Sequence, residues 1–207
     1  MQADKKRMDS KRLTQMALLI AIIVLMAFTP LGYLKTAGVE ITFIMIPVVI
    51  GAIVLGPGAG ALLGAVFGAT SFIQCFGMSA FGAMLLQVNW FYTFVACMVP
   101  RVLMGWLSGL IFRLLYRMDK TKLISFAVAS LSGALLNTIF FVTSIGVLFY
   151  NTMLGMAAQS GVSVLSFMLT FITLNTLLES IACLVIGTAV SKAVYKIVNR
   201  DQTHTLA

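Results

Sequence analysis

Long runs of apolar residues, separated by short polar or basic segments, occupy most of the chain. The runs do not alternate strictly between apolar and polar residues, as the strands of a membrane barrel do, and several are long enough for a helix that crosses a bilayer. The pattern predicts six membrane-spanning helices, at about 13–29, 41–55, 59–76, 94–116, 123–149 and 162–190. We expect 30–40 and 150–161 to be loops, and 77–93 to be a partly helical segment packed at the outer face.

The composition places the chain among integral membrane proteins. Of its 207 residues, 60% are hydrophobic and only 10% are charged, and the mean hydropathy is +1.04. Soluble domains carry about 25% charged residues. Because a bilayer offers no water to free backbone groups, a spanning chain folds as helices or as a closed barrel, and the unbroken apolar runs favour helices. We predict an all-α integral membrane protein with a single transmembrane domain over 1–207.

The basic residues predict the orientation of the chain. With both termini in the cytoplasm, six spans place twelve of the fourteen Lys and Arg residues on the cytoplasmic side. Those twelve are Lys5, Lys6, Arg7, Lys11, Arg12, Arg113, Arg117, Lys120, Lys122, Lys192, Lys196 and Arg200. Only Lys35 and Arg101 are left outside, in agreement with the positive-inside rule. We predict a multi-pass plasma-membrane protein, and topology explains the net charge of +8 better than nucleic-acid binding does.

Four polar or charged residues fall inside the predicted spans: Arg101, Asn137, Asn175 and Glu179. Such residues are costly in a bilayer and usually face a cavity or a partner. Asn175 and Glu179 are four residues apart, so they share a helix face. We predict that the four line a ligand site toward the outer side, where the cation would suit a small carboxylate. The alternative is structural, with Arg101 paired to Glu179 and the asparagines bridging helices.

The outer segments add further candidates to this site. Lys35 lies in the first outer loop, and Asn89 and Trp90 lie in the 77–93 segment. Trp90, with Phe91 and Tyr92, could close the site from outside. The same aromatic residues could equally form an interfacial belt that anchors the protein in the membrane.

Small residues repeat at four-residue spacing in two spans. Ala17 and Ala21 form a smooth strip on the first span, suited either to docking of another membrane helix or to packing within the molecule. Gly60, Gly64 and Gly68 stack on one face of the third span and allow a neighbouring backbone to approach closely.

Metal binding and catalysis are poorly supplied in this sequence. Cys75, Cys97 and Cys183 are far apart in sequence, and the single histidine, His204, lies in a polar tail. We interpret the cysteines as small apolar packing residues. We expect no cofactor, no metal and no enzymatic activity.

At the family level the chain resembles the substrate-binding (S) component of an energy-coupling factor (ECF) vitamin transporter. The resemblance rests on Ala17 and Ala21, on the run GVEITFIMIPVVIGAIVLGPGAGALLGAVFG at 38–68, and on the pair Pro100-Arg101. It implies a subunit that captures a vitamin from outside and docks on a transmembrane coupling subunit through Ala17 and Ala21. It also implies that two separate ATPase subunits hydrolyse ATP, with which the lack of a Walker motif agrees.

The 38–68 run is most similar to members assigned to pantothenate, a small hydroxylated carboxylate. The resemblance implies that Arg101 or Lys35 binds the carboxylate, while Asn137, Asn175 and Glu179 bind the hydroxyl and amide groups. A folate or a pyridoxine/pyrimidine-type ligand is an alternative, because aromatic residues near the mouth could stack on a ring. An autonomous secondary transporter is a further alternative, although the two halves of the chain show no convincing similarity.

Overall fold

Helices make up most of the structure, a computed structural model that describes residues 10–30, 32–36, 39–119, 123–161, 163, 166 and 176–204. The last described helix begins at Thr176, contains the π-helical turn η1 and continues as α9 to His204. Its apolar part is Thr176–Val198. The elements are α1 (Ser10–Ala27), β1 (Tyr33–Thr36), β2 (Val39–Thr42), α2 (Met45–Val54), α3 (Pro57–Gln74), α4 (Ala80–Val88), α5 (Trp90–Met118), α6 (Ile124–Leu148), α7 (Tyr150–Gln159), η1 (Cys183–Gly187) and α9 (Thr188–His204).

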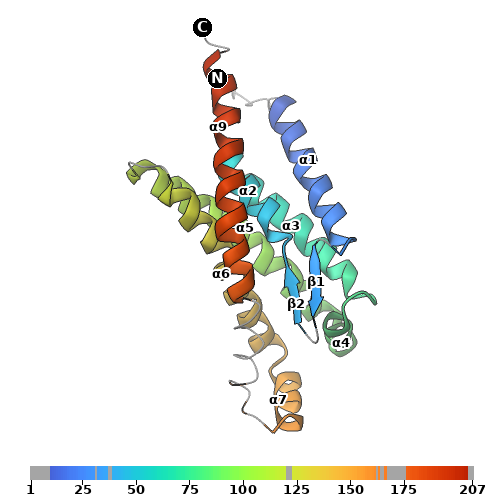
Figure 1. The fold of residues 1–207 in the computed structure, drawn as a ribbon. Helices are drawn as coiled ribbons and strands as arrows, with labels where there is room; N and C mark the ends of the chain where they lie inside the picture. The colour runs from blue at the N-terminus through green and yellow to red at the C-terminus, as the bar shows by residue number, and fades with distance from the viewer. Residues whose placement is uncertain are drawn as a thin grey trace, which may run out of the picture.

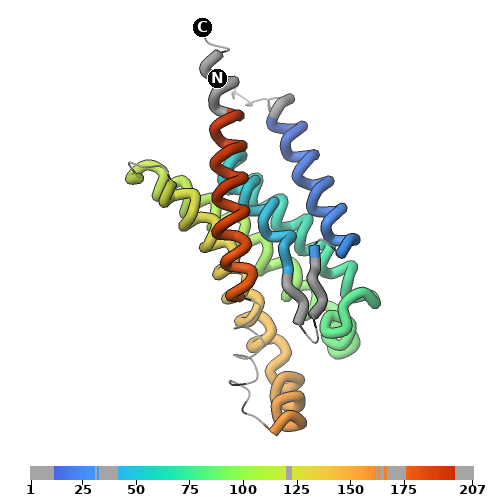
Figure 2. Tube along the Cα trace, viewed as in Figure 1, coloured from blue at the N-terminus to red at the C-terminus, as the bar shows by residue number. Residues whose placement is uncertain are grey.

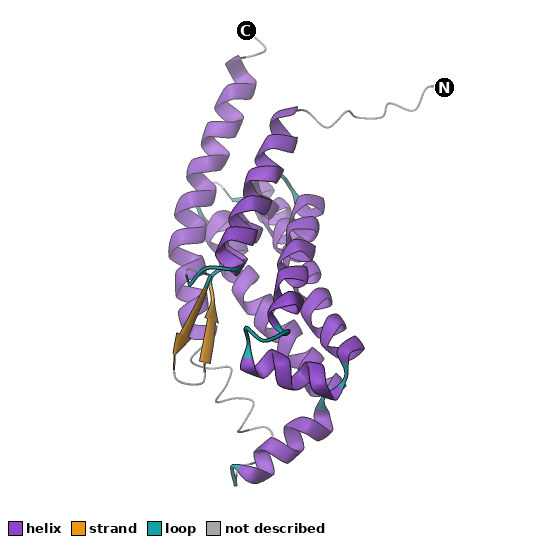
Figure 3. Ribbon diagram, turned by 90° about the vertical axis from the view of Figure 1, so that its right-hand side faces the viewer, coloured by secondary structure: helices purple, strands orange, loops and turns teal. Residues whose placement is uncertain are grey.

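The bundle has two distinct ends. Helix α1 begins and α9 ends at one of them, which we call the terminal end (Figures 1 and 2). The β-hairpin, α4 and α7 lie toward the other, which we call the hairpin end (Figures 1 and 3). The terminal end corresponds to the side predicted to be cytoplasmic.

Two arginines meet the α2–α3 turn at the terminal end. The Nη2 group of Arg12 donates a hydrogen bond of 2.5 Å to the carbonyl oxygen of Leu55, one of the carbonyls that the end of α2 leaves without a helical partner. Arg113 lies so close to Gly56 that a Cβ there would be 2.7 Å from its Nη2 atom. Gly56 also has φ of 101°, which favours glycine. Two basic residues far apart in sequence thus meet at the same turn.

Backbone contact between α3 and α5 fixes the centre of the bundle. A Cβ on Gly60 would lie 2.2 Å from the carbonyl oxygen of Gly105, and a Cβ on Gly64 would lie 2.2 Å from that of Arg101. On Gly68 it would lie 2.9 Å from the carbonyl oxygen of Cys97. The predicted glycine face is therefore confirmed, and the helix against which it packs is the one that carries Arg101.

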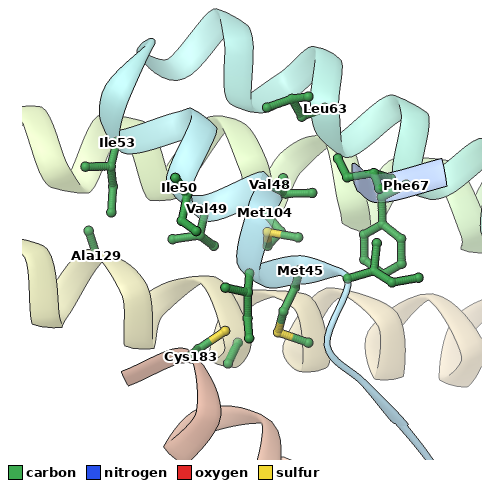
Figure 4. Packing of buried hydrophobic residues seen from close by; sticks show 14 of the residues in the cluster. Met45, Val48, Val49, Ile50, Ile53, Leu63, Phe67, Met104, Ala129 and Cys183 are labelled. Carbon is green, nitrogen blue, oxygen red and sulfur yellow. The ribbon is translucent and has the colours of Figure 1, made fainter. Parts of the chain in front are cut away.

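Helix α2 is the buried centre of the core. Its ten residues give a length of about 15 Å, which is half of the roughly 30 Å hydrocarbon core. Figure 4 shows α2 side chains such as Met45 and Val48 enclosed by residues of α3, α5, α6 and η1, including Phe67 and Met104. The short span predicted at about 41–55 is corrected in its bounds, because β2 ends at Thr42 and α2 begins only at Met45.

The segment predicted to be the first outer loop, at 30–40, instead contains most of a β-hairpin. Strands β1 and β2 pair antiparallel, with Tyr33 opposite Thr42 and Lys35 opposite Glu40. The strands are rich in β-branched and aromatic residues, which favour extended backbone. The all-α prediction holds for the membrane helices but missed this hairpin, because a four-residue strand carries little periodic signal.

The predicted loop at 150–161 is also corrected, because Tyr150–Gln159 forms α7. Its sequence contains good helix formers such as Met, Leu, Ala and Gln. Met153 and Ala157, four residues apart, are buried, and Met153 belongs to a second apolar cluster with Leu85 and Phe149. Segment 77–93 contains α4 and the start of α5, as expected for a partly helical region.

Three of the described helices are long and apolar enough to cross a membrane: α5, α6 and Thr176–Val198. The apolar helices Arg12–Ala27 and Met45–Val54 are shorter. The last helix also extends well beyond the predicted end at 190. The chain is thus a helical membrane protein, while the number of spans and the orientation of the termini remain predictions.

Candidate functional site

Arg101 is held by a backbone carbonyl that a proline leaves free. In an α-helix the carbonyl of Ala96 accepts a hydrogen bond from the N–H of residue 100, but Pro100 has no N–H. The Nη1 group of Arg101 takes its place and donates to the Ala96 oxygen at 2.7 Å. The arginine side chain is therefore folded back along α5 toward the hairpin end.

Two phenylalanines flank the guanidinium of Arg101. Its Cζ atom lies 4.5 Å from the ring centroid of Phe141 on α6 and 5.5 Å from that of Phe67 on α3. Only 9% of Arg101 is exposed, and its buried Nε atom has no hydrogen-bond partner among the described residues. A buried donor on a cation is costly when it is unsatisfied, so this atom points to a ligand.

Asn137 is the second buried polar residue among those predicted to line the site. It lies four residues before Phe141 on α6, so the two side chains share a helix face. Asn137 is 7% exposed, and its Oδ1 atom has no hydrogen-bond partner in the part of the chain that the structure describes. The site thus offers an unsatisfied donor on a cation and an unsatisfied acceptor on an amide.

Glu179 binds the hairpin. Its Oε1 atom accepts a hydrogen bond of 2.8 Å from the backbone N–H of Thr42, the last residue of β2. Nearby, Thr176 donates from Oγ1 to Oγ1 of Thr138 at 3.3 Å, which joins the last helix to α6. Glu179 is 5% exposed, and Arg101 is the buried cation with which it was predicted to pair. Within the described residues, however, each side chain is hydrogen-bonded to a backbone group and not to the other.

For the remaining predicted ligand residues, the structure shows no contact with Arg101 among the described residues. Asn89 caps the N-terminus of α5, because its Oδ1 atom accepts hydrogen bonds from the N–H groups of Phe91 at 3.0 Å and Tyr92 at 3.2 Å. Trp90 is 66% exposed. Lys35 pairs with Glu40 through the backbone of the hairpin, and Asn175 lies outside the described residues.

Sequence reasoning missed the aromatic residues around Arg101. Phe67 and Phe141 are two of fifteen phenylalanines in an apolar sequence, so nothing in their local pattern distinguishes them. The Pro100-Arg101 pair did carry a signal, because a proline inside a helix always frees the carbonyl four residues before it. Only the packing of α3 and α6 on α5 shows which aromatic rings contact Arg101.

A second candidate surface lies on α1. Ala17 and Ala21 are both exposed in the part of the chain that the structure describes. They lie in an open apolar groove on the outside of the helix. The residues that line this groove are Ala17, Ile20, Ala21, Val24, Leu25, Phe28 and Thr29.

The described cysteines are all buried, as packing residues are, and the Sγ atoms of Cys75 and Cys97 lie 3.9 Å apart. Among the described residues no three His, Cys, Asp or Glu side chains come together in a way that could hold a metal ion.

Comparison of the sequence with known proteins identifies the family of the chain. A search of the curated proteins finds no match to the chain. The family model for the substrate-specific component of ECF transporters matches residues 11–191, which include α1, the hairpin, Arg101, Asn137 and Glu179. The chain therefore belongs to the ECF transporter substrate-specific components, the membrane subunits that bind the transported substrate while ATPase activity lies in partner subunits.

Proposed function

We propose that this S component binds pantothenate with high affinity at the hairpin end and delivers it by docking on an ECF module. The observation that carries the proposal is the buried Arg101, whose Nε atom has no partner among the described residues. The similarity of the 38–68 run to pantothenate-type members supports the choice of vitamin.

Electrostatics favours an anionic ligand. A guanidinium removed from water needs a counter-charge or a full set of acceptors. Here the described contacts are one carbonyl and two aromatic faces. Cation–π contacts return about 0.5–2 kcal/mol each, which is less than the several kcal/mol that burying an ion costs. Glu179 is hydrogen-bonded to the hairpin and not to Arg101, so a ligand carboxylate would be the anion in direct contact with the guanidinium and would accept from Nε.

The ligand is also expected to carry hydrogen-bond donors. Asn137 offers a buried, unsatisfied acceptor on the face of α6 that meets Arg101 through Phe141. Pantothenate carries a carboxylate, hydroxyl groups and an amide, so it can satisfy both residues. Glu179, Asn175, Lys35, Asn89 and Trp90 remain further ligand candidates in this proposal, with Glu179 acting through the hairpin that it holds.

Docking is assigned to the groove on α1. Exposed alanines allow another helix to approach closely, and the groove around them is apolar. We expect a transmembrane helix of the coupling subunit to pack there, with two ATPase subunits attached on the cytoplasmic side. Six spans with both termini cytoplasmic, in the plasma membrane, complete the proposal.

A binding screen of the purified protein tests the substrate. The full chain in detergent would be titrated with pantothenate, folate, pyridoxine and a thiamine-type pyrimidine by calorimetry, and any copurifying ligand would be identified by mass spectrometry. We expect pantothenate to bind tightly. Tight binding of a vitamin without a carboxylate, and none of pantothenate, would overturn both the vitamin and the role of Arg101.

A further inference from the structure

We propose that Pro100 and Phe141 are positioning residues that orient Arg101 toward the ligand carboxylate without binding the ligand themselves. The inference rests on the proposed function, because it names the residues that prepare the carboxylate anchor. It also makes statements about Arg101 that can be tested in the free protein.

Pro100 frees the backbone carbonyl that binds Arg101. On a regular helix each carbonyl already accepts from the N–H four residues ahead, so an arginine that binds one must share that acceptor. Pro100 lies inside α5 and removes the N–H that would bind Ala96. The freed oxygen, 2.7 Å from Nη1, fixes one end of the guanidinium fork. Pro100 is itself completely buried in the bundle.

Phe141 contacts the guanidinium of Arg101 with its ring. The Arg101 Cζ atom lies 4.5 Å from the ring centroid of Phe141, nearer than to that of Phe67. A ring face at this distance attracts the cation and restricts the plane of the guanidinium. With Nη1 held by Ala96 and the plane held by the ring, rotation of the side chain is largely removed before a ligand arrives.

The consequence is preorganisation. Immobilising a flexible side chain upon binding costs about 0.5–1.5 kcal/mol, and a side chain that is already held avoids this cost. The contacts that hold Arg101 leave its Nε–H group without a hydrogen-bond partner among the described residues. A carboxylate can accept hydrogen bonds from this group and from a second N–H of the guanidinium. Loss of either positioning residue should therefore weaken carboxylate binding specifically.

The test compares two ligands in four proteins. Full-length wild type, Pro100→Ala, Phe141→Leu and Phe141→Tyr would be titrated with pantothenate and with pantothenol, in which an alcohol replaces the carboxylate. We expect Pro100→Ala and Phe141→Leu to weaken pantothenate binding about tenfold, in line with the loss of one cation–π contact or one charged hydrogen bond. Affinity for pantothenol should stay unchanged, and Phe141→Tyr should restore pantothenate binding because the ring is kept.

Two controls separate positioning from structure. Pro100→Ala restores a helical hydrogen bond but also removes buried ring atoms, so its melting temperature is measured together with its affinity, and the binding comparison is made well below that temperature. In an Arg101→Ala background, neither substitution should weaken binding further, because residues that act through one group are not additive. Equal losses for pantothenate and pantothenol would overturn the proposal, since they would mean that Phe141 contacts the ligand directly.

A ligand-free measurement decides the proposal even if wild type does not bind pantothenate. The Nε–Hε signal of Arg101, assigned by its loss in Arg101→Lys, should shift in NMR spectra of Phe141→Leu because the ring current of Phe141 is removed. It should stay near the wild-type position in Phe141→Tyr. An unchanged signal in Phe141→Leu would refute the positioning role, whereas failure of wild type to bind pantothenate would count only against the proposed substrate.

Discussion

The carboxylate of Glu179 accepts a hydrogen bond of 2.8 Å from the backbone N–H of Thr42, although the two residues are 137 positions apart. This bond ties the end of β2, where the chain enters the buried helix α2, to the last described helix. Thr42 ends the hairpin and Glu179 is 5% exposed, so a buried carboxyl group is hydrogen-bonded to the end of the hairpin. In the proposed function, Glu179 acts on the candidate site through this hairpin.

Glu179→Ala should loosen the hairpin. A hydrogen bond to a charged group contributes about 1.5–3 kcal/mol, so we expect amide exchange at Thr42 to accelerate by about tenfold or more. Glu179→Gln keeps an acceptor oxygen without the charge and should show a smaller increase. Hydrogen exchange followed by mass spectrometry of peptides that contain 39–44 measures both. Exchange at Thr42 that is unchanged in Glu179→Ala would show that the bond does not hold the hairpin.

Arg101→Ala should weaken ligand binding by an order of magnitude or more while the fold remains intact. The reason is that the carboxylate would lose its counter-charge and a charge-assisted hydrogen bond. Calorimetry with pantothenate measures the affinity, and the melting temperature of the detergent-solubilised protein serves as the control. Wild-type affinity in this variant would remove Arg101 from the site.

Ala17→Leu combined with Ala21→Leu should abolish uptake but leave ligand binding by the isolated subunit unchanged. Both side chains are exposed in the α1 groove, so larger residues would block a docking helix without disturbing the core. Leu18→Ala is a matched control, because Leu18 is 62% exposed but does not line the groove. Uptake of labelled vitamin by cells and binding by purified protein are the two measurements. Loss of binding in the double variant would contradict the assignment.

Gly64→Ala should destabilise the protein and disturb the site at once. Its Cβ would lie 2.2 Å from the carbonyl oxygen of Arg101, so α3 and α5 would have to separate at a cost of about 1–3 kcal/mol. Gly58→Ala on the same helix meets nothing within 4 Å and is the matched control. We expect the melting temperature to fall only for Gly64→Ala. Equal effects of the two substitutions would mean that the close contact is not important for stability.

Hydropathy and spacing predicted the features that depend on local sequence. The apolar runs of α5 and α6 were recognised because a bilayer requires about 20 apolar residues in one helix. The glycine face of α3 follows from its four-residue spacing, since residues at i and i+4 lie on one side of any helix. The Pro100-Arg101 pair and the alanine strip also belong to this class, and the family to which they pointed was confirmed.

The tertiary structure decided what depends on partners distant in sequence. The apolar stretch at 41–55 looks like one span, but the helix covers only Met45–Val54, packed among α3, α5 and α6, and Thr42 lies in a strand. Periodicity could not reveal which phenylalanines meet Arg101, nor that Glu179 binds Thr42. The sequence by itself thus determined the membrane class, the glycine and alanine faces and the unusual cation. Packing between helices decided what surrounds that cation, because such contacts depend on three-dimensional approach and not on spacing along the chain.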